Sequence, residues 1–399
     1  MGVRNKWLDT SAACLTSLLI AGGALRFIFG IGQSAFYFTC LAVIAVLSLI
    51  RLVHDGCRAA RAAWQYLMMF LFLLSWLSIS IIWTMSVSQY RIDLLLLAAV
   101  LVTLLLLVCN FSPGFIRMVQ WWLVFFSNVV AVSILYYLGG FIQVEAWGTA
   151  VYDFYLTAGR CLALGYITSL VSFLVTPSKK VFWFLSALLH VAALAVTMAR
   201  GALLFSALIV LLLPIWGIEL SRFKLRLERL LARRYLLFTI PAVVVTLFLA
   251  LQIPGNRLRL LRMLSLGEEL SVGGRGLIWS RALDYLTYKP LLGYGLGSSG
   301  YLSAGAEELY PHNLFFQIWL DGGVLAFVLL LFIVAFPLAA FLRLKKELIR
   351  EHLAVFLCYV YLIMEYSKSH SVYTARDLFM FGFAVVLCST LPESGGKEG

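Results

Sequence analysis

The sequence predicts an all-α, polytopic membrane protein with about twelve transmembrane helices and one long, partly helical loop outside the membrane. Two observations predict this class. Apolar residues make up 62% of the 399 residues and charged residues only 13%, unlike soluble globular domains. Apolar runs of about 18 residues or more, each long enough to cross ~30 Å of hydrocarbon, recur from one end of the chain to the other.

The apolar runs place the predicted helices in order along the chain. They fall at 11–31, 34–53, 64–84, 93–110, 117–138, 157–176, 181–199, 201–218, 235–251, 323–342, 353–367 and 375–391. No small-residue cleavage site follows the first run, so we expect a retained span rather than a signal peptide. The only long polar interruption divides the chain into 1–251, a loop at 252–322, and 323–399.

The basic residues predict the orientation. An even number of spans puts both termini on one side, and most of the 31 lysines and arginines lie in loops on that side, such as SRFKLRLERLLARR at 221–234. The positive-inside rule makes that side cytoplasmic, so the long loop faces outward. The net charge of +12 is explained by these loops and anionic lipid, and a nucleic-acid partner is not expected.

Several kinds of chemistry are disfavoured by what the sequence contains. The seven cysteines lie in or beside spans, without the spacing of a disulfide framework or a zinc site. The 19 acidic residues form no DxD or HExxH motif, which disfavours a metal, although Glu307 and Glu308 keep that route open. GLGSSG at 295–300 matches a dinucleotide fingerprint but follows no strand, so we interpret it as a flexible or tightly turned connector and expect no cofactor.

Arg200 lies in TMARGALL, at a tight turn between two predicted spans near the outer surface. An arginine so close to hydrocarbon needs an anion or a route to water. It either extends to a lipid phosphate, as long basic side chains do at membrane surfaces, or binds the phosphate of a substrate.

Arg275 begins a predicted helix and shares its packed face with Trp279 and Leu286. A helix N-terminus disfavours a cation and welcomes an anion. Gly273 and Gly274 would let backbone amides approach that anion closely. A negatively charged ligand explains this pattern; the alternative is a surface arginine in water.

His312 follows Pro311, and proline favours the first position of a helix. We therefore expect the imidazole in the first helical turn, where the helix dipole favours the neutral base. His370, at the outer end of a late span, is its rival for that role.

Three stretches carry a family resemblance: TMARGALL, GGRGLIWSRALDYLTYKPLLGYGLG and PHNLFFQIWLDGGVLA. Together they resemble the bacterial O-antigen ligase and polymerase superfamily, whose members have an arginine ending one span, a loop with "GR…W…P…GYG", and "HN" before "Q…GG". The resemblance covers roughly 197–325, and the predicted topology is similar to that of the ligases.

The resemblance implies an inner-membrane glycosyltransferase whose donor is a glycan on undecaprenyl diphosphate and whose acceptor, in a ligase, is lipid A–core oligosaccharide in the periplasm. Arg200 and Arg275 would then bind the diphosphate and His312 would act as base, with Asn313 and Gly274 in supporting positions. Two guanidinium groups can replace a metal because their paired donors match phosphate oxygens.

Two further features lie outside these motifs. Arg160, at the outer entry to the sixth span, is a candidate third cation, and NRLRLLRMLSL at 256–266 has the pattern of an interfacial amphipathic helix. Three alternatives stay open: an O-antigen polymerase with the same donor, a protein-glycosylating transferase of the superfamily, and a twelve-span transporter. A two-halved transporter would place its principal linker midway and inside the cell, and would show internal symmetry.

Overall fold

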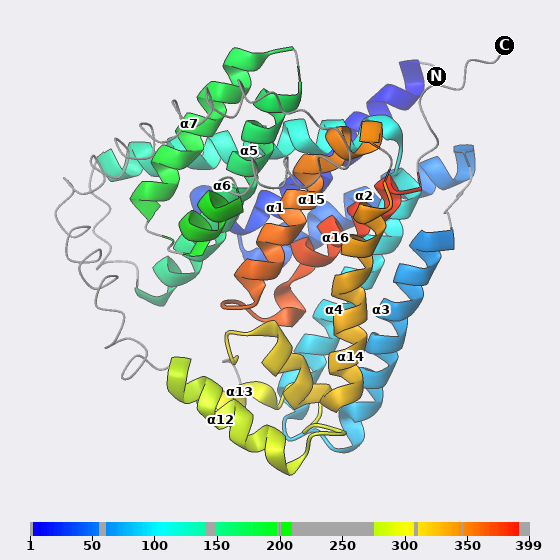
Figure 1. Cartoon of the computed structure of the whole chain (residues 1–399), viewed down its shortest axis with the longest axis vertical. Helices are drawn as coiled ribbons and strands as arrows, with labels where there is room; N and C mark the ends of the chain where they lie inside the picture. Colours follow the sequence, from blue (N-terminus) through cyan, green and yellow to red (C-terminus); the bar gives the residue numbers. More distant parts are fainter. Residues whose placement is uncertain are drawn as a thin grey trace. The chain divides into compact units, whose positions relative to one another are not determined.

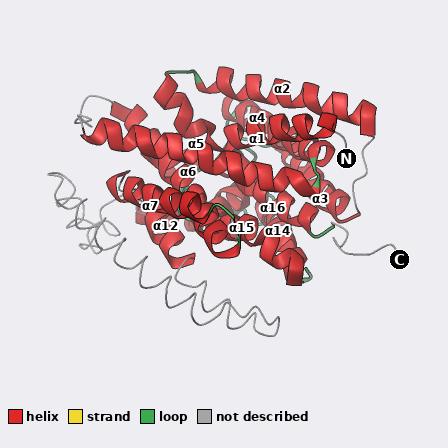
Figure 2. Ribbon diagram, turned by 90° about the horizontal axis from the view of Figure 1, so that it is seen from above, coloured by secondary structure: helices red, strands yellow, loops and turns green. Residues whose placement is uncertain are grey.

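The computed structural model describes residues 3–55, 61–139, 148–176, 178–197, 199, 201–209, 275–306, 310–344 and 346–390. Every regular element in these ranges is a helix (Figures 1 and 2). The chain forms two compact units, each built from separate segments. The first contains Met1–Gly56, Asn110–Arg259 and Lys345–Tyr361, and the second contains Cys57–Cys109, Leu260–Leu344 and Leu362–Gly399.

The described part of the first unit is a bundle of long apolar helices. It contains α1 (Val3–Phe29), α2 (Gln33–Asp55), α5 (Pro113–Gly139), α6 (Gly148–Val175), α7 (Lys180–Thr197) and most of α15 (Lys346–Tyr366). Helix α1 packs against α2, α5 and α6, and α7 packs against α5 and α6. Small residues make the close approach of α1 and α6 possible: a Cβ at Gly23 would lie 3.1 Å from the Thr157 methyl carbon.

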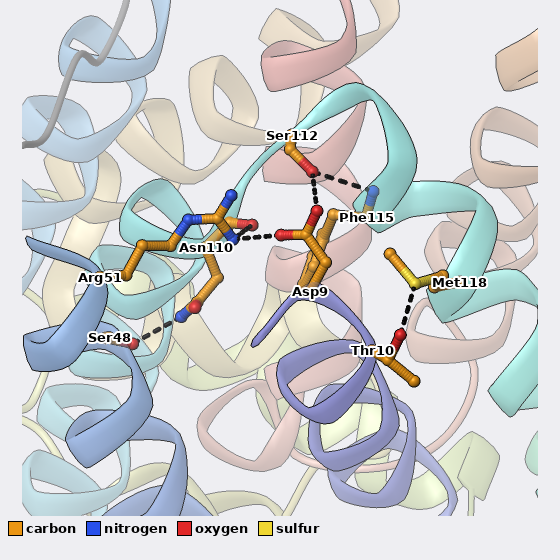
Figure 3. A network of polar contacts seen from close by, with 8 residues as sticks. All are labelled: Asp9, Thr10, Ser48, Arg51, Asn110, Ser112, Phe115 and Met118. Atoms are coloured by element: carbon orange, nitrogen blue, oxygen red, sulfur yellow. Dashed lines mark hydrogen bonds and ion pairs between the residues drawn. The ribbon is translucent and has the colours of Figure 1, made fainter. Parts of the chain in front are cut away.

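A polar cluster is buried in this unit, and Figure 3 shows its contacts. Arg51 Nη1 donates to Asp9 Oδ1 at 2.5 Å and to the Asn110 carbonyl at 2.9 Å. Ser112 Oγ donates to the second oxygen of Asp9, and Asn110 Nδ2 donates to Ser48 Oγ. Each charge therefore has an opposite charge and further hydrogen bonds, which is what burial of an ion pair requires.

The described part of the second unit is arranged around α14 (Figure 1). It contains α3 (Arg61–Ile79), η1 (Ser80–Ile82), nearly all of α4 (Val87–Asn110), α12 (Arg275–Tyr288), α13 (Ser299–Ala304), α14 (Leu314–Leu342), the end of α15, η4 (Val372–Thr374) and α16 (Arg376–Cys388). Helices α3, α12, α13 and α16 all pack against α14. Rings hold α3 to α16: Tyr66 stacks on Phe383, and Phe70 meets Phe379 edge-on.

Helix α14 is broken near its first third, as the sequence predicts from Gly322–Gly323. Gly323 has φ 67° and ψ −167°, a conformation that strongly favours glycine. A Cβ there would lie 2.0 Å from the Leu291 carbonyl oxygen, so no side chain fits. Directly after the break, Val324 N donates to the Pro290 carbonyl. This bond attaches the segment after α12 to α14 at the break.

Eight described helices are long and apolar enough to cross a membrane, so the chain is a multi-pass membrane protein. They match the first seven predicted spans and, within α14, the span predicted at 323–342. The predicted spans at 353–367 and 375–391 correspond to α15 and α16, which do not meet the same criteria of length and hydropathy. The span at 235–251, the second half of 201–218, and the amphipathic stretch at 256–266 lie outside the described residues.

Candidate functional site

The predicted site residues fall into three groups. Arg275, His312 and Asn313 all lie in the second unit, on α12 and immediately before α14. Arg160 is half-buried on α6 in the first unit, and its role as a third cation stays a prediction. Arg200 and Gly274 lie outside the described residues.

Asn313 is the N-cap of α14. Its backbone is extended, and its side-chain oxygen accepts from Phe315 N at 2.9 Å and Phe316 N at 3.2 Å. This bonding satisfies two of the amides that the first turn leaves unpaired. The prediction that Pro311 begins the helix is therefore wrong, because the Asn313 side chain caps the helix two residues later. His312 precedes this cap and does not lie in the first turn.

His312 has an unusual backbone conformation, with φ 55°. Side-chain-bearing residues seldom adopt such an angle, and it concentrates where surrounding contacts enforce it. Trp279 on α12 supplies one such contact by donating from Nε1 to the Pro311 carbonyl at 2.9 Å. The His312 ring lies 4.4 Å from the Tyr310 ring, centroid to centroid. The backbone next to His312 is thus bonded to α12, and its imidazole lies against the Tyr310 ring.

Burial, and then the positive charges of Arg275 and Lys368, lower the pKa of His312 to about 4. The histidine is therefore neutral near pH 7, as the sequence predicts, although the causes are burial and neighbouring cations. Its Nδ1 is buried and has no hydrogen-bond partner in the part of the chain that the structure describes. Arg275 itself is exposed at the start of α12, so the prediction that it shares the packed face with Trp279 and Leu286 is wrong.

Two buried polar residues, Gln317 and Asp321, attach separate loops to α14, the helix that follows His312. Gln317 donates from Nε2 to Ser371 Oγ at 2.9 Å and accepts from Val372 N at 2.8 Å. Asp321 lies one turn further along, on the same face. It accepts from the amides of Ser298 and Ser299, from the Ser299 hydroxyl, and from the Tyr373 hydroxyl.

The sequence reasoning assigned no role to Gln317 or Asp321. A signal was available: the two lie four residues apart in an apolar helix, and buried polar groups of that kind need partners. Their partners could not be identified from the chain alone because they are about 20 to 55 residues away in sequence.

The glycine-rich segment at 293–300 is a tightly turned connector, which is one of the two forms that the sequence predicted. Tyr294 N and Gly295 N donate to the carbonyls of Leu320 and Asp321, just before the break in α14. Leu296 N donates to Ser80 Oγ, and Thr84 Oγ1 donates to the Leu296 carbonyl. The described residues contain no strand beside it. Its glycines therefore allow close backbone packing.

The connection between α15 and α16 completes the described surroundings of His312. Lys368 Nζ lies 3.2 Å from Glu365 Oε1, and its positive charge acts on His312. His370, the rival base, is buried in the same connection with φ 65°, and its ring lies 5.5 Å from that of Tyr366. The sequence motifs do not include Lys368.

The arrangement suits an anion beside a neutral base. Two cations act on one uncharged imidazole, and the same two positive charges would also attract a phosphate. Among the described residues, no group of three histidine, cysteine or acidic side chains could hold a metal ion. Glu307 and Glu308, the carboxylates that kept a metal route open, lie outside those residues.

Comparison with known proteins agrees with the motifs. The family model described as O-antigen ligase matches residues 184–331. A protein from Rickettsia conorii, provisionally named a polysaccharide ligase, is 35% identical over 82 residues, which cover 17% of this chain and 20% of the relative. A similarly named protein from Rickettsia felis is 33% identical over 82 residues, with the same coverage. The matches span about a fifth of these relatives, and they confirm the predicted resemblance to the O-antigen ligases.

Proposed function

We propose that this protein is an inner-membrane glycosyltransferase that transfers O-antigen polysaccharide from undecaprenyl diphosphate to lipid A–core oligosaccharide on the periplasmic side. The observation that carries the proposal is the neutral His312 beside the positive charges of Arg275 and Lys368. His312 and Arg275 lie within the region that the O-antigen ligase model matches. The lipid-soluble donor suits a multi-pass membrane protein.

The reaction assigns a task to each residue. A hydroxyl of the acceptor attacks the anomeric carbon, the bond from that carbon to the diphosphate oxygen breaks, and its electron pair leaves with the diphosphate. His312 takes the hydroxyl proton. Arg275 stabilises the charge that develops on the leaving group, because its paired donors match two phosphate oxygens. Arg200 has the same proposed role, and the chemistry requires no metal.

Substrate binding would improve His312 as a base. A pKa of about 4 makes the imidazole neutral but weakly basic, whereas the best general base has a pKa close to the working pH. A bound diphosphate brings negative charge next to the ring and offsets the two cations, so it raises the pKa of His312. The base would therefore become effective when the donor is in place.

Transfer by the purified protein tests the proposal. We expect polymer to move from undecaprenyl diphosphate to lipid A–core in the presence of EDTA. Loss of activity in EDTA, with rescue by magnesium or manganese, would contradict the metal-independent mechanism and direct attention to Glu307 and Glu308.

The lipopolysaccharide of a deletion strain separates the ligase from the polymerase. Core without polymer, with polymer retained on the carrier lipid, is the expected result. Core that carries a single repeat would identify a polymerase instead, with the same donor and the same site.

A further inference from the structure

The connection between α15 and α16, residues 367–375, is fixed against the beginning of α14. Gln317 bonds both to the side chain of Ser371 and to the amide of Val372, and Asp321 accepts from the Tyr373 hydroxyl. Gln317 and Asp321 are both buried. Three consecutive residues of the connection are thus attached to the helix whose N-cap directly follows His312.

Lys368 lies close to these attachment points. It is three residues from Ser371, a span of at most about 10 Å. Gln317 lies about one turn into α14, roughly 5 Å along the axis from the first helical residue. The attachment therefore keeps Lys368 near the beginning of α14, and its positive charge acts on His312.

The ammonium group of Lys368 is also oriented. Its Nζ lies 3.2 Å from Glu365 Oε1, one turn earlier at the end of α15, where the Glu365 side chain is 3% exposed and that of Lys368 is 25% exposed. A buried carboxylate holds the flexible stem in place but leaves the cation partly open to solvent. An ammonium group can contact several oxygens at once because it carries three donors.

An independent observation agrees with this position. The groups whose charges act on His312 are Arg275, from the start of α12, and Lys368, from the connection after α15. These two cations come from separate elements of the same unit. A diphosphate carries several negative charges, and two cations from separate elements can contact both of its phosphates.

We propose that Lys368 is a further anion-binding residue of this site, which contacts the diphosphate of the lipid-linked donor together with Arg275. The inference rests on the proposed function, because it names the same substrate. Glu365 is then a positioning residue that keeps the ammonium group directed at the phosphate. Residues 367–375 form one side of the site, and their hydrogen bonds to Gln317 and Asp321 fix the position of this segment.

The test measures binding of farnesyl diphosphate, a short isoprenyl diphosphate, to the full-length protein in lipid nanodiscs. Lys368→Met removes the charge, and we expect the dissociation constant to rise about fivefold to tenfold. Lys368→Arg keeps the charge and should bind within about threefold of the unchanged protein. The matched control is Lys289→Met, because Lys289 lies in the same unit, over the Tyr294 ring, at the other end of α12.

A second readout separates a binding role from a structural one. Removing the Lys368 charge should raise the pKa of His312, because one cause of its low value is lost. The acidic limb of the pH profile of kcat/KM should therefore move to higher pH. Lys289→Met should leave that profile unchanged. If Lys368→Met is not recovered folded, Lys368→Gln is measured in its place, with the same expected loss.

The outcomes distinguish this inference from the proposed function. If the unchanged protein binds farnesyl diphosphate and Arg275→Ala weakens that binding while Lys368→Met does not, Lys368 is not a ligand and only the inference fails. If the unchanged protein does not bind the probe, the proposed function fails and the inference fails with it.

Discussion

Two regions of the molecule surround their charged groups in very different ways. In the first unit, Arg51 is paired with Asp9, and both are bonded further by neighbouring polar groups (Figure 3). In the second unit, Arg275 and Lys368 act on an uncharged His312 whose Nδ1 has no partner in the described structure. The first cluster is complete in itself. The second is a site that an anion would complete. We therefore assign a structural role to the first cluster and a catalytic role to the second.

The largest expected effect lies in the second region. His312→Ala should lower the transfer rate by roughly 10²–10⁴, the usual range for the loss of a general base. Binding of the carrier-linked donor should change little, because the cations bind the diphosphate. Single-turnover kinetics with separate binding measurements give both quantities.

The matched control for that variant is His370→Ala, which should have a mild effect. Normal turnover of His312→Ala would show that His312 is not the base. A large loss in His370→Ala instead would move the role to His370, which lies in the connection attached to α14. If both variants turn over normally, no histidine is the base.

The first region should respond in stability rather than in chemistry. Asp9→Ala leaves the buried Arg51 without its carboxylate, and loss of one partner of a buried pair typically costs about 3–5 kcal/mol. We expect a lower unfolding temperature in detergent, with normal turnover for each folded molecule. A variant of normal stability whose turnover is lost would contradict the division between the two regions.

The geometry of Arg275 should matter as well as its charge. Arg275→Lys keeps the positive charge but loses the paired donors, and we expect a rate loss of about tenfold to a hundredfold with folded protein recovered in normal yield. Arg281→Lys, on another turn of α12, is the control and should be close to neutral. Equal activity of the two variants would mean that Arg275 acts only through its charge, or not at all.

The sequence predicted the elements of the fold better than their contacts. Long apolar runs determine helices, so the long described helices fall close to where they were expected, and Gly322–Gly323 marked the break in α14. The start of α14 was misplaced because the proline was weighted above the capping power of Asn313.

The candidate site was predicted only where its residues lie in motifs. Arg275 and His312 could be identified because each follows a local pattern at a helix start. Lys368 could not, because nothing in its own sequence neighbourhood shows that Gln317, about fifty residues earlier, attaches the following turn. The contacts between distant segments decide which charges surround His312, and periodicity does not contain them.

The pKa of His312, measured with and without a bound isoprenyl diphosphate, shows directly whether the anion binds beside the imidazole. The protein has five histidines, so selective labelling of their rings and comparison with His312→Gln would assign the His312 resonance in nanodiscs. The account predicts a pKa of about 4 in the free protein and a clear rise when farnesyl diphosphate binds, since the anion offsets the positive charges of Arg275 and Lys368. A pKa near the ordinary value of about 6.5 that does not change on addition of the diphosphate would contradict it.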